Sequence, residues 1–463
     1  MEKGKEQNPT LPRELIVEIL LRLPVRSLLR FKSVCKSWSS LISDPKFAVS
    51  HFDLAASPSH RLLLRLKNNE SQVESIHLDS LFDHDSDVVN LKFPLPTPIP
   101  EHTFHLFSET DFSLRNMGSC RGFILLTNWK GDVIVWNPST GSYKRISESL
   151  VGLLDHFLNG IGYDASTDDY LLVLIQVNQL SPYLDDPESP PLRPTRIKFF
   201  SFKTNLWFRF DGPCAKYMDV GGQLFCTGSF FNGALHWLII STDNNVHVIV
   251  VFDLVERRLS EIALPHDLNM ESELLFRNMY LRVMGGCLTV TVCYPEKAVI
   301  WMMKEYKVHS SWTKLFLLST SDIPRNTFIP ICFTKNGGIL GSNESGRLVK
   351  FNDKGELLEH RAYDDEEETF GSSDLHYFTY RESLLSLPCE NSGSSLLHFF
   401  IYGKSLSEGD YEEASEGDYE EASEGDYEEA SEGLRSLALH AINLRFGHLL
   451  QESIVIKHPS MLE

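Results

Sequence analysis

Apolar residues near the start of the chain recur at helical spacing. The first set has the i, i+1, i+4, i+5, i+8 pattern of a wide helix face: Leu15, Ile16, Ile19, Leu20 and Leu23. Pro12 suits the first turn of this helix, and Pro24 ends it. A second set steps by 3, 4, 3 and 4 residues over the next two helical segments: Leu28, Phe31, Cys35, Trp38 and Ile42. The pattern predicts a small helical module over residues 10–52.

This module has two apolar faces, because Leu29, Val34 and Leu41 lie off the second stripe. A helical bundle of this size can cover only one face by itself. The other face packs either on the rest of the chain or on an obligate partner. Between Glu18 and Asp44 there are five bases and no acid, which favours an acidic partner: Arg22, Arg26, Arg30, Lys32 and Lys36.

From about residue 60 to 403 the pattern changes to short β-branched and aromatic runs separated by Gly, Asn, Asp and Ser, which is typical of an all-β domain. Four units begin with a glycine, at intervals of 111, 53 and 52 residues: Gly122, Gly233, Gly286 and Gly338. The first interval is about two periods and contains a further strand pair, YLLVLIQV and IKFFSFKTNLWFRF. A period near 50 residues is that of kelch-type propeller blades.

The units 61–93 and 376–403 bring the expected number of blades to about seven, and six or eight also fit the pattern. A pair of β-sandwiches is the alternative architecture, but it would not need this period. The spacing of five tryptophans predicts that they lie in blade cores: Trp136, Trp207, Trp237, Trp301 and Trp312.

Composition limits the classes of function. The 463 residues are 42 % hydrophobic, enough for at least one large core. The polar start MEKGKEQNPT and the lack of an apolar run of about 18 residues indicate an intracellular protein, cytoplasmic or nuclear, with no membrane partner. The eight cysteines form no CxxC pair, so neither disulfides nor a metal site are expected. A broad basic surface for nucleic acid is also lacking in the bulk of the chain.

The net charge of −20 is concentrated near the end of the chain. Residues 407–433 are an acidic octapeptide repeated three times plus a remnant, with 13 acids and no base, so the rest of the chain carries only −7. We expect residues 1–9 and 405–433 to be disordered and residues 434–463 to add a last strand or helix to the β domain. Three serines followed at +3 by aspartate are possible acidophilic phosphorylation sites: Ser407, Ser415 and Ser423.

Motifs that could suggest catalysis lack their structural context. GSCRG at 118–122 is followed by a predicted strand instead of the helix of a nucleophile elbow. GIGYDA at 160–165 is not followed by a phosphate-binding helix and is interpreted as a β-turn. The acidic cluster at 83–87 lacks a second set of metal ligands, and His236 lies in an apolar strand and is expected to be a core residue. The sequence therefore predicts no catalytic, cofactor-binding or metal site, and a protein that is not an enzyme.

The stretch LPRELIVEILLRLPVRSLLRFKSVCKSWSSLISDPKF closely resembles an F-box, the helical module that docks onto the Skp-type adaptor of cullin-based ubiquitin ligases. The resemblance covers the whole motif. Together with the apolar pattern, it implies these adaptor contacts: Leu11, Pro12, Leu15, Ile16, Ile19, Leu20, Leu23, Pro24, Leu28, Val34, Cys35 and Trp38.

Residues 60–403 resemble the F-box-associated, kelch-like domain of plant F-box proteins, through GSCRGFILL, VWNPSTGSYKRI, GIGYDASTDDY, FFSFKTNLW, FNGALHWL and FDLVERRLSEIALP in the family's order. The resemblance implies an α+β multidomain protein, with a small helical F-box followed by a large all-β propeller. It implies a substrate-recognition subunit of an SCF-type ubiquitin ligase, whose partners are the Skp-type adaptor, the cullin scaffold and a target protein. The alternative function is a ligand- or glycan-binding propeller without ubiquitin ligation.

Overall fold

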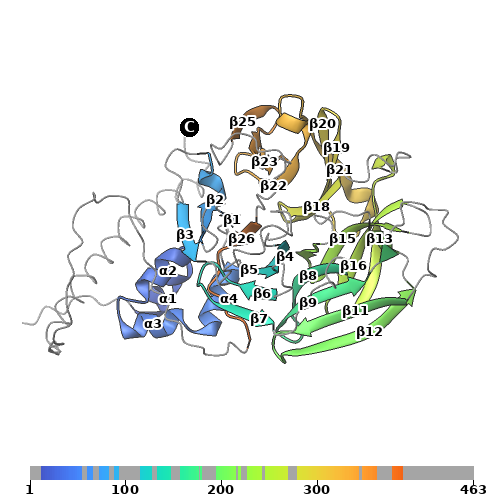
Figure 1. Cartoon of the computed structure of the whole chain (residues 1–463). Helices are drawn as coiled ribbons and strands as arrows, with labels where there is room; N and C mark the ends of the chain where they lie inside the picture. Colours follow the sequence, from blue (N-terminus) through green and yellow to red (C-terminus); the bar gives the residue numbers. More distant parts are fainter. Residues whose placement is uncertain are drawn as a thin grey trace, which may run out of the picture. The chain divides into compact units, whose positions relative to one another are not determined.

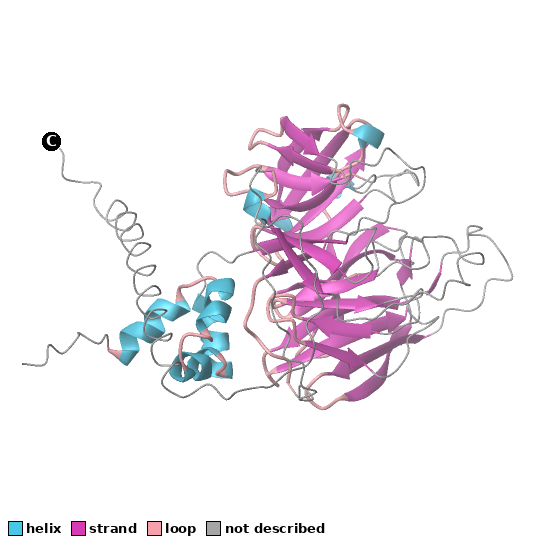
Figure 2. Ribbon diagram, turned by 60° about the vertical axis from the view of Figure 1, so that its left-hand side comes forward, coloured by secondary structure: helices cyan, strands magenta, loops and turns pink. Residues whose placement is uncertain are grey.

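The computed structural model describes residues 12–54, 60–65, 72–82, 88–92, 115–127, 133–146, 157–176, 178–179, 194–214, 217–219, 227–241, 246–268, 279–343, 347–361 and 378–388. The chain divides into two compact units. One contains the described α-helices, and the other, Ala56–Ser392, contains the strands (Figure 2). The predicted combination of a small helical module and a large all-β domain is confirmed.

The helical module has four helices among the described residues: α1 (Arg13–Leu21), α2 (Val25–Phe31), α3 (Lys36–Ile42) and α4 (Pro45–Leu54). Pro12 and Pro24 occupy the N-caps of α1 and α2, where the missing N–H is not needed for the helix. Cys35 caps α3, since its Sγ accepts a hydrogen bond from the Trp38 N–H at 3.5 Å. None of the described helices is long and apolar enough to cross a membrane.

The described strands form six blades, A to F, each with an antiparallel four-stranded core, in which the first strand named below is innermost. Blade A is β26 (Phe378–Arg381), β1 (His60–Arg65), β2 (Gln72–His77) and β3 (Val88–Lys92). Blade B is β4 (Arg115–Cys120), β5 (Phe123–Thr127), β6 (Val133–Trp136) and β7 (Tyr143–Ile146). Blade C is β8 (Phe157–Asp164), β9 (Asp169–Gln176), β11 (Pro194–Ser201) and β12 (Leu206–Cys214).

Blade D is β14 (Ser229–Phe231), β15 (Ala234–Ser241), β16 (Val246–Asp253) and β17 (Arg258–Ala263), extended by the short strands β13 (Tyr217–Asp219) and β10 (Asn178–Gln179). Blade E is β18 (Met279–Met284), β19 (Cys287–Tyr294), β20 (Lys297–Met303) and β21 (Trp312–Ser319). Blade F is β22 (Ile329–Phe333), β23 (Ile339–Ser342), β24 (Leu348–Phe351) and β25 (Leu357–Arg361). Figure 1 shows β4, β8, β18, β22 and β26 near the centre of this unit and β3, β7, β12 and β25 at its periphery.

The expected number of about seven blades is corrected to six. The sequence pattern treated 61–93 and 376–403 as separate units, but β26 pairs with β1 and supplies the inner strand of blade A. His60 lies opposite Arg381, and Leu63 lies opposite Phe378. Strands from the two ends of the β domain therefore close the ring as one blade.

The glycine period marks one kind of turn. Gly122, Gly233, Gly286 and Gly338 lie at the connections between the two inner strands of blades B, D, E and F, and blade C fills the double interval. Gly122 has φ +90°, and a Cβ there would lie 2.3 Å from Cβ of Ser383, so this turn requires glycine. The predicted period is confirmed, with its cause in the repeated inner turn.

The core of the propeller lies between neighbouring blades, where buried side chains of each sheet pack against the next. Trp136, Trp237 and Trp301 are buried as predicted, and the Trp237 Nε1–H of blade D donates to the Asn159 carbonyl of blade C at 3.0 Å. The other two tryptophans are only half-buried: Trp312 packs against the buried cluster between blades D and E, whereas the prediction is wrong for Trp207. Both lie on outermost strands, where no further strand of the same blade covers them.

His236 joins blades D and E as a buried core residue, as the sequence indicated. Its Nδ1 lies 3.2 Å from the Ser229 carbonyl, which can only accept, so Nδ1 carries the hydrogen. Nε2 therefore accepts from the Tyr306 hydroxyl at 2.8 Å. Burial, opposed by the Ser229 bond and reinforced by the charge of Lys307, lowers the pKa of His236 to about 4. The neutral ring is part of the folded state.

This histidine predicts an acid-sensitive propeller. The unfolded ring binds a proton near pH 6.5 and the folded ring only near pH 4, so stability falls as pH decreases between these values, by about 3 kcal/mol. Urea unfolding at pH 7 and pH 4.5 measures the slope, which His236→Gln should reduce. His247 has a similarly lowered pKa and titrates in the same window, so the difference between the two proteins isolates His236. An equal slope in both would contradict the prediction.

Candidate partner-binding surface

The interior of the helical module is built from all four helices. The buried residues are Leu20, Val25, Leu28, Ile42, Phe47, Ala48, His51 and Phe52. Half of them belong to α4, which contacts α1 and α3. The sequence analysis did not separate this helix, although its buried positions repeat the i, i+1, i+4, i+5 spacing of α1. One apolar face is thus covered by α4.

His51 links α4 to the connection between α1 and α2. Its Nε2 lies 2.8 Å from the Leu23 carbonyl, so this nitrogen donates, and its ring stacks on Phe47 with centroids 6.3 Å apart. The bond satisfies a carbonyl just after the end of α1, where the helix itself provides no N–H donor. Sequence reasoning missed this role because the partner is a backbone atom 28 positions away.

The predicted adaptor contacts differ in exposure. Pro12, Leu15 and Pro24 are exposed, with Leu15 48 % exposed. A further group is half-buried: Ile16, Ile19, Leu23, Val34, Cys35 and Trp38. Leu20 and Leu28 have no exposed surface, so the assignment of direct contact to these two is corrected: they hold the helices together. Leu11 lies outside the described residues.

Trp38 is positioned by the residues around it. Its ring lies 5.5 Å from the ring of Phe31, at an interplanar angle of 59°. Its backbone N–H donates to Sγ of Cys35 in the cap described above, which fixes the Trp38 backbone at the start of α3. The half-buried indole is thus attached to a capped helix start and packs on Phe31 of α2.

Positive charge surrounds this apolar surface. Arg30 and Lys36 are exposed, and burial lowers the pKa of the half-buried Lys32. Arg22 pairs with Glu18 at 3.1 Å, with both side chains about two-thirds exposed at 67 % and 63 %. An ion pair this exposed contributes little and exchanges readily for another carboxylate. The acidic partner that the sequence predicts for these bases stays a prediction.

The catalytic-looking motifs occupy structural positions. Cys120 ends β4, Phe123 begins β5, and burial raises the pKa of the Cys120 thiol, so a thiolate is disfavoured. The interpretation of residues 160–165 as a β-turn is wrong for most of the motif, since Gly160–Asp164 belong to β8 and the turn starts at Ala165. No group of three or more His, Cys, Asp or Glu could hold a metal among the described residues. The cluster at 83–87 lies outside them.

Known families match both units of the chain. Residues 9–50 match the F-box domain, and residues 68–386 match the F-box associated beta propeller domain. The chain belongs to the F-box proteins with an associated propeller. F-box protein CPR1 of Arabidopsis thaliana is 29 % identical over 325 residues, 66 % of this chain and 72 % of CPR1. An F-box/kelch-repeat protein of the same plant is 28 % identical over 314 residues, 66 % of this chain and 78 % of the relative.

These findings make the chain a plant F-box protein. Its two domains imply a substrate-recognition role in SCF complexes in general and binding of a Skp-type adaptor. F-box proteins are generally substrate adaptors rather than catalysts. Among solved structures, TolB from Acinetobacter baumannii aligns with a TM-score of 0.35 at 10 % identity, over 66 % of each chain, and carries no argument about this F-box protein.

The predicted phosphorylation sites Ser407, Ser415 and Ser423 lie outside the described residues, as do the acidic repeat and the segment 434–463.

Proposed function

We propose that this F-box protein is the target receptor of an SCF-type ubiquitin ligase. The helical module binds a Skp-type adaptor and, through it, a cullin scaffold, and the propeller recruits a protein for ubiquitination. The observation that carries the proposal is the presence, in one chain, of an F-box and an F-box associated propeller over nearly all the described residues.

The helical module supports the first half of this proposal. Leu15 and Pro12 are exposed on one end of α1, and Leu23 and Trp38 are half-buried. An apolar surface with cations around it is complementary to an apolar groove bordered by carboxylates, where the charges set orientation and association rate. Because α4 supplies half of the buried residues of the module, the fold does not require these side chains to be buried as well.

Recruitment needs no catalytic group on this chain. Holding a target beside a separate conjugating enzyme raises the effective concentration of the target, so that ubiquitin transfer takes place within one complex. The requirement is a rigid receptor. The propeller supplies rigidity because its closing segment is bound: Asn137 Nδ2 donates to the carbonyls of Ser383 and Leu385 at 3.1 and 3.0 Å. Ser383 N–H in turn donates to Ser139 Oγ at 3.1 Å.

Replacing both Leu23 and Trp38 by alanine tests the adaptor surface. The double variant should lose co-purification of a Skp-type adaptor by at least about tenfold, since two large apolar contacts are removed from the centre of the interface. Quantitative affinity purification of the full chain co-expressed with the adaptor measures this. Val49→Ala with Leu54→Ala is the matched control, because these apolar residues of α4 are 42 % and 62 % exposed and outside the predicted surface. Equal recovery from both variants would contradict the proposal.

A further inference from the structure

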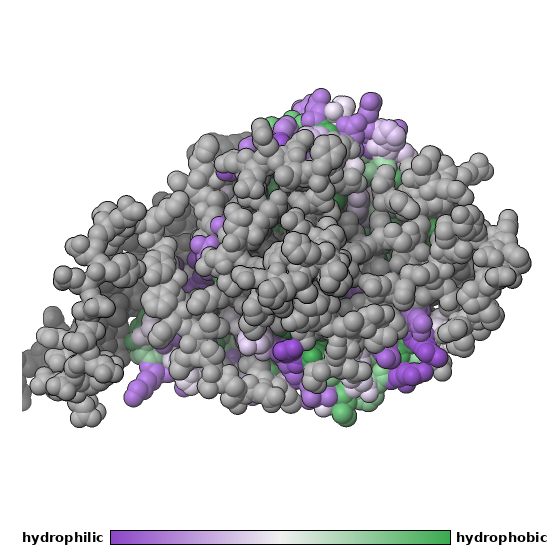
Figure 3. Space-filling model, viewed as in Figure 1, coloured by the Kyte–Doolittle hydropathy of each residue, from purple (hydrophilic) through white to green (hydrophobic). Residues whose placement is uncertain are grey.

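Strand β12 forms the outer edge of blade C and carries exposed apolar side chains. Among the described strands it pairs only with β11, so its other backbone edge has no strand beside it. Leu206 and Phe208 are 58 % and 42 % exposed, and lie on the same face because side chains alternate along a strand. Figure 1 shows β11 and β12 at the periphery, and in the same view Figure 3 shows hydrophobic beside hydrophilic residues along the lower edge.

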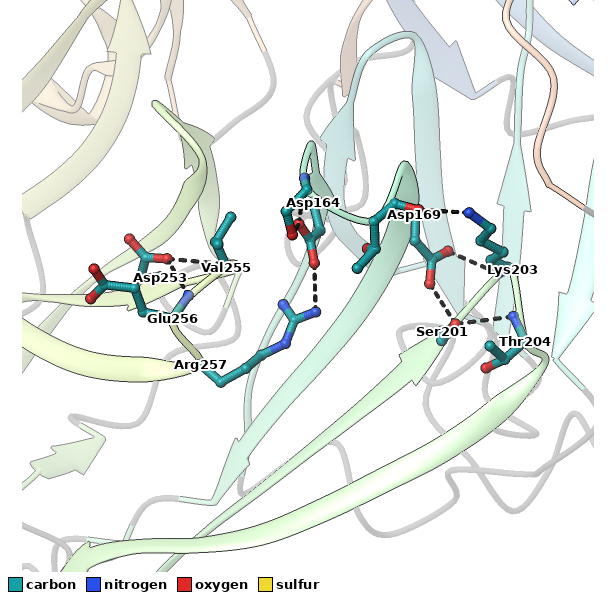
Figure 4. A network of polar contacts seen from close by, with 11 residues as sticks. Asp164, Asp169, Ser201, Lys203, Thr204, Asp253, Val255, Glu256 and Arg257 are labelled. Atoms are coloured by element: carbon teal, nitrogen blue, oxygen red, sulfur yellow. Dashed lines mark hydrogen bonds and ion pairs between the residues drawn. The ribbon is translucent and has the colours of Figure 1, made fainter.

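The exposed aromatic ring is part of a fixed stack. Phe208 lies opposite Phe199 of β11, and their rings stack at 5.0 Å with an interplanar angle of 14°. The guanidinium carbon of Arg257 lies 4.9 Å from the centroid of the Phe199 ring. Arg257 Nη2 donates to Oδ2 of the buried Asp164 at 2.7 Å (Figure 4). Burial acts to raise the pKa of Asp164, but hydrogen bonds from Ser166 and the charge of Arg257 outweigh it and lower the pKa. The carboxylate therefore remains charged beside Arg257.

A second buried carboxylate holds the turn that leads into β12. Asp169 accepts a hydrogen bond from Ser201 Oγ and one from the Lys203 N–H at 2.8 Å, and Ser201 Oγ accepts from the Thr204 N–H at 3.1 Å (Figure 4). The β11–β12 hairpin is therefore attached to β9 at its turn. An edge strand held in this way needs little ordering when a partner binds, which lowers the entropic cost of association.

The charge of this hairpin is opposite to that of the whole chain. Although the chain has a net charge of −20, residues 194–214 contain one acid, Asp211, and four bases: Arg196, Lys198, Lys203 and Arg209. Arg209 is exposed and lies opposite Lys198 in the β11–β12 register. The two faces of β12 therefore differ: Leu206 and Phe208 lie on one, and Arg209 lies on the other.

We propose that β12 docks an extended acidic segment of a recruited target, which adds to the blade as a further strand. The segment alternates apolar and acidic residues, so that its apolar side chains cover Leu206 and Phe208 and its carboxylates reach Arg209. Backbone hydrogen bonds to the open edge supply affinity, and the alternating side chains supply specificity. This inference rests on the proposed function, since it names the surface by which the receptor holds its target.

A fluorescein-labelled peptide with the sequence Glu-Val-Glu-Phe-Glu-Val-Glu tests the surface in fluorescence anisotropy with the full chain bound to its adaptor. Leu206→Ser combined with Phe208→Ser should weaken peptide binding at least about tenfold, and Arg209→Glu should weaken it about fivefold. The matched control is Leu317→Ser, since Leu317 is 61 % exposed on β21, the outer strand of blade E, and should bind as wild type. A peptide with lysine in place of glutamate should bind at least about tenfold more weakly.

Pairing with β12 also predicts slower hydrogen exchange of the amides of residues 206–210 when the acidic peptide is bound. The proposal is overturned if wild-type protein does not bind the peptide, if the β12 variants bind it equally, or if the lysine peptide binds as well. It is also overturned if light scattering shows a dimer that Phe208→Ser converts to a monomer, because the edge then serves a second copy. Adaptor recovery from the same samples separates the two hypotheses: its loss contradicts the proposed function, whereas peptide results alone contradict only the β12 surface.

Discussion

Replacing Glu382 by glutamine is expected to lower the free energy of unfolding of the propeller by about 3 kcal/mol. Glu382 follows the closing strand β26, and its Oε1 lies 3.9 Å from Nη1 of Arg61 on β1. Their side chains are only 5 % and 2 % exposed, so the variant removes the negative charge of a buried ion pair. Arg61 keeps its bonds to Ser75, whose side-chain oxygen and carbonyl each lie 2.7 Å from it. These neutral acceptors do not replace the lost charge.

Urea unfolding followed by tryptophan fluorescence measures this effect, since the buried Trp136 and Trp237 report on the blades. Glu256→Gln is the matched control because Glu256 pairs with Arg258 at the surface, with side chains 55 % and 72 % exposed. Loss of an exposed pair should change stability by at most about 0.5 kcal/mol. Similar losses in both variants would show that the closing ion pair has no special role.

Replacing Leu20 by alanine is expected to destabilise the helical module by about 3 kcal/mol and to abolish adaptor binding through unfolding. Leu20 has no exposed surface and lies on α1, which packs against α4, so the variant loses apolar burial and leaves a cavity. Because a module this small has little stability to spare, its open state should become populated. Hydrogen exchange of residues 12–54 in the full chain measures this directly, as faster exchange throughout α1–α4.

Leu15→Ala in the same helix separates folding from contact. Leu15 is 48 % exposed, so its truncation should leave hydrogen exchange of the module close to wild type while adaptor recovery falls. If Leu20→Ala exchanged as slowly as wild type, or if Leu15→Ala exchanged as fast as Leu20→Ala, the division of these leucines between interior and surface would be wrong.

Local patterns predicted the classes of element in both units. Pro24 ended the first helix because a proline cannot continue it, and α1 ends at Leu21. The glycine period predicted the repeated blades, because Gly122, Gly233 and Gly286 have positive φ values at the inner turns of blades B, D and E, where glycine is favoured. The fourth helix had a comparable signal, but His51 interrupts its apolar positions. The burial of His51 is explained by its hydrogen bond to the Leu23 carbonyl, which no sequence spacing indicates.

The number of blades was not predictable from the same patterns. The repeat pattern gives the number of units along the chain. The number of blades is smaller by one, because the first and last units join in a single blade. Phe378–Arg381 read as the start of a further unit until its pairing with β1 placed it in blade A. That pairing depends on the angle between successive blades, which is a sum over all the interfaces and has no local signature.

Exposure was likewise decided by packing. Leu15, Leu20 and Leu28 belong to the same apolar pattern, but Leu15 is at the surface and the other two are in the interior. A spacing identifies the face of a helix and not the helix that covers it. The stack of Arg257, Phe199 and Phe208 joins two blades through residues that are distant in the sequence, and only the fold brings them together.

The sequence by itself determined a helical module followed by repeated antiparallel blades, and the family to which both belong, because periodicity, turn chemistry and motif order are local properties. Only the tertiary structure decided that the ring has six blades, that α4 covers one face of the module, and that β12 presents an aromatic edge flanked by bases. These features arise from contacts between segments far apart in the chain, whose geometry depends on how the whole domain packs.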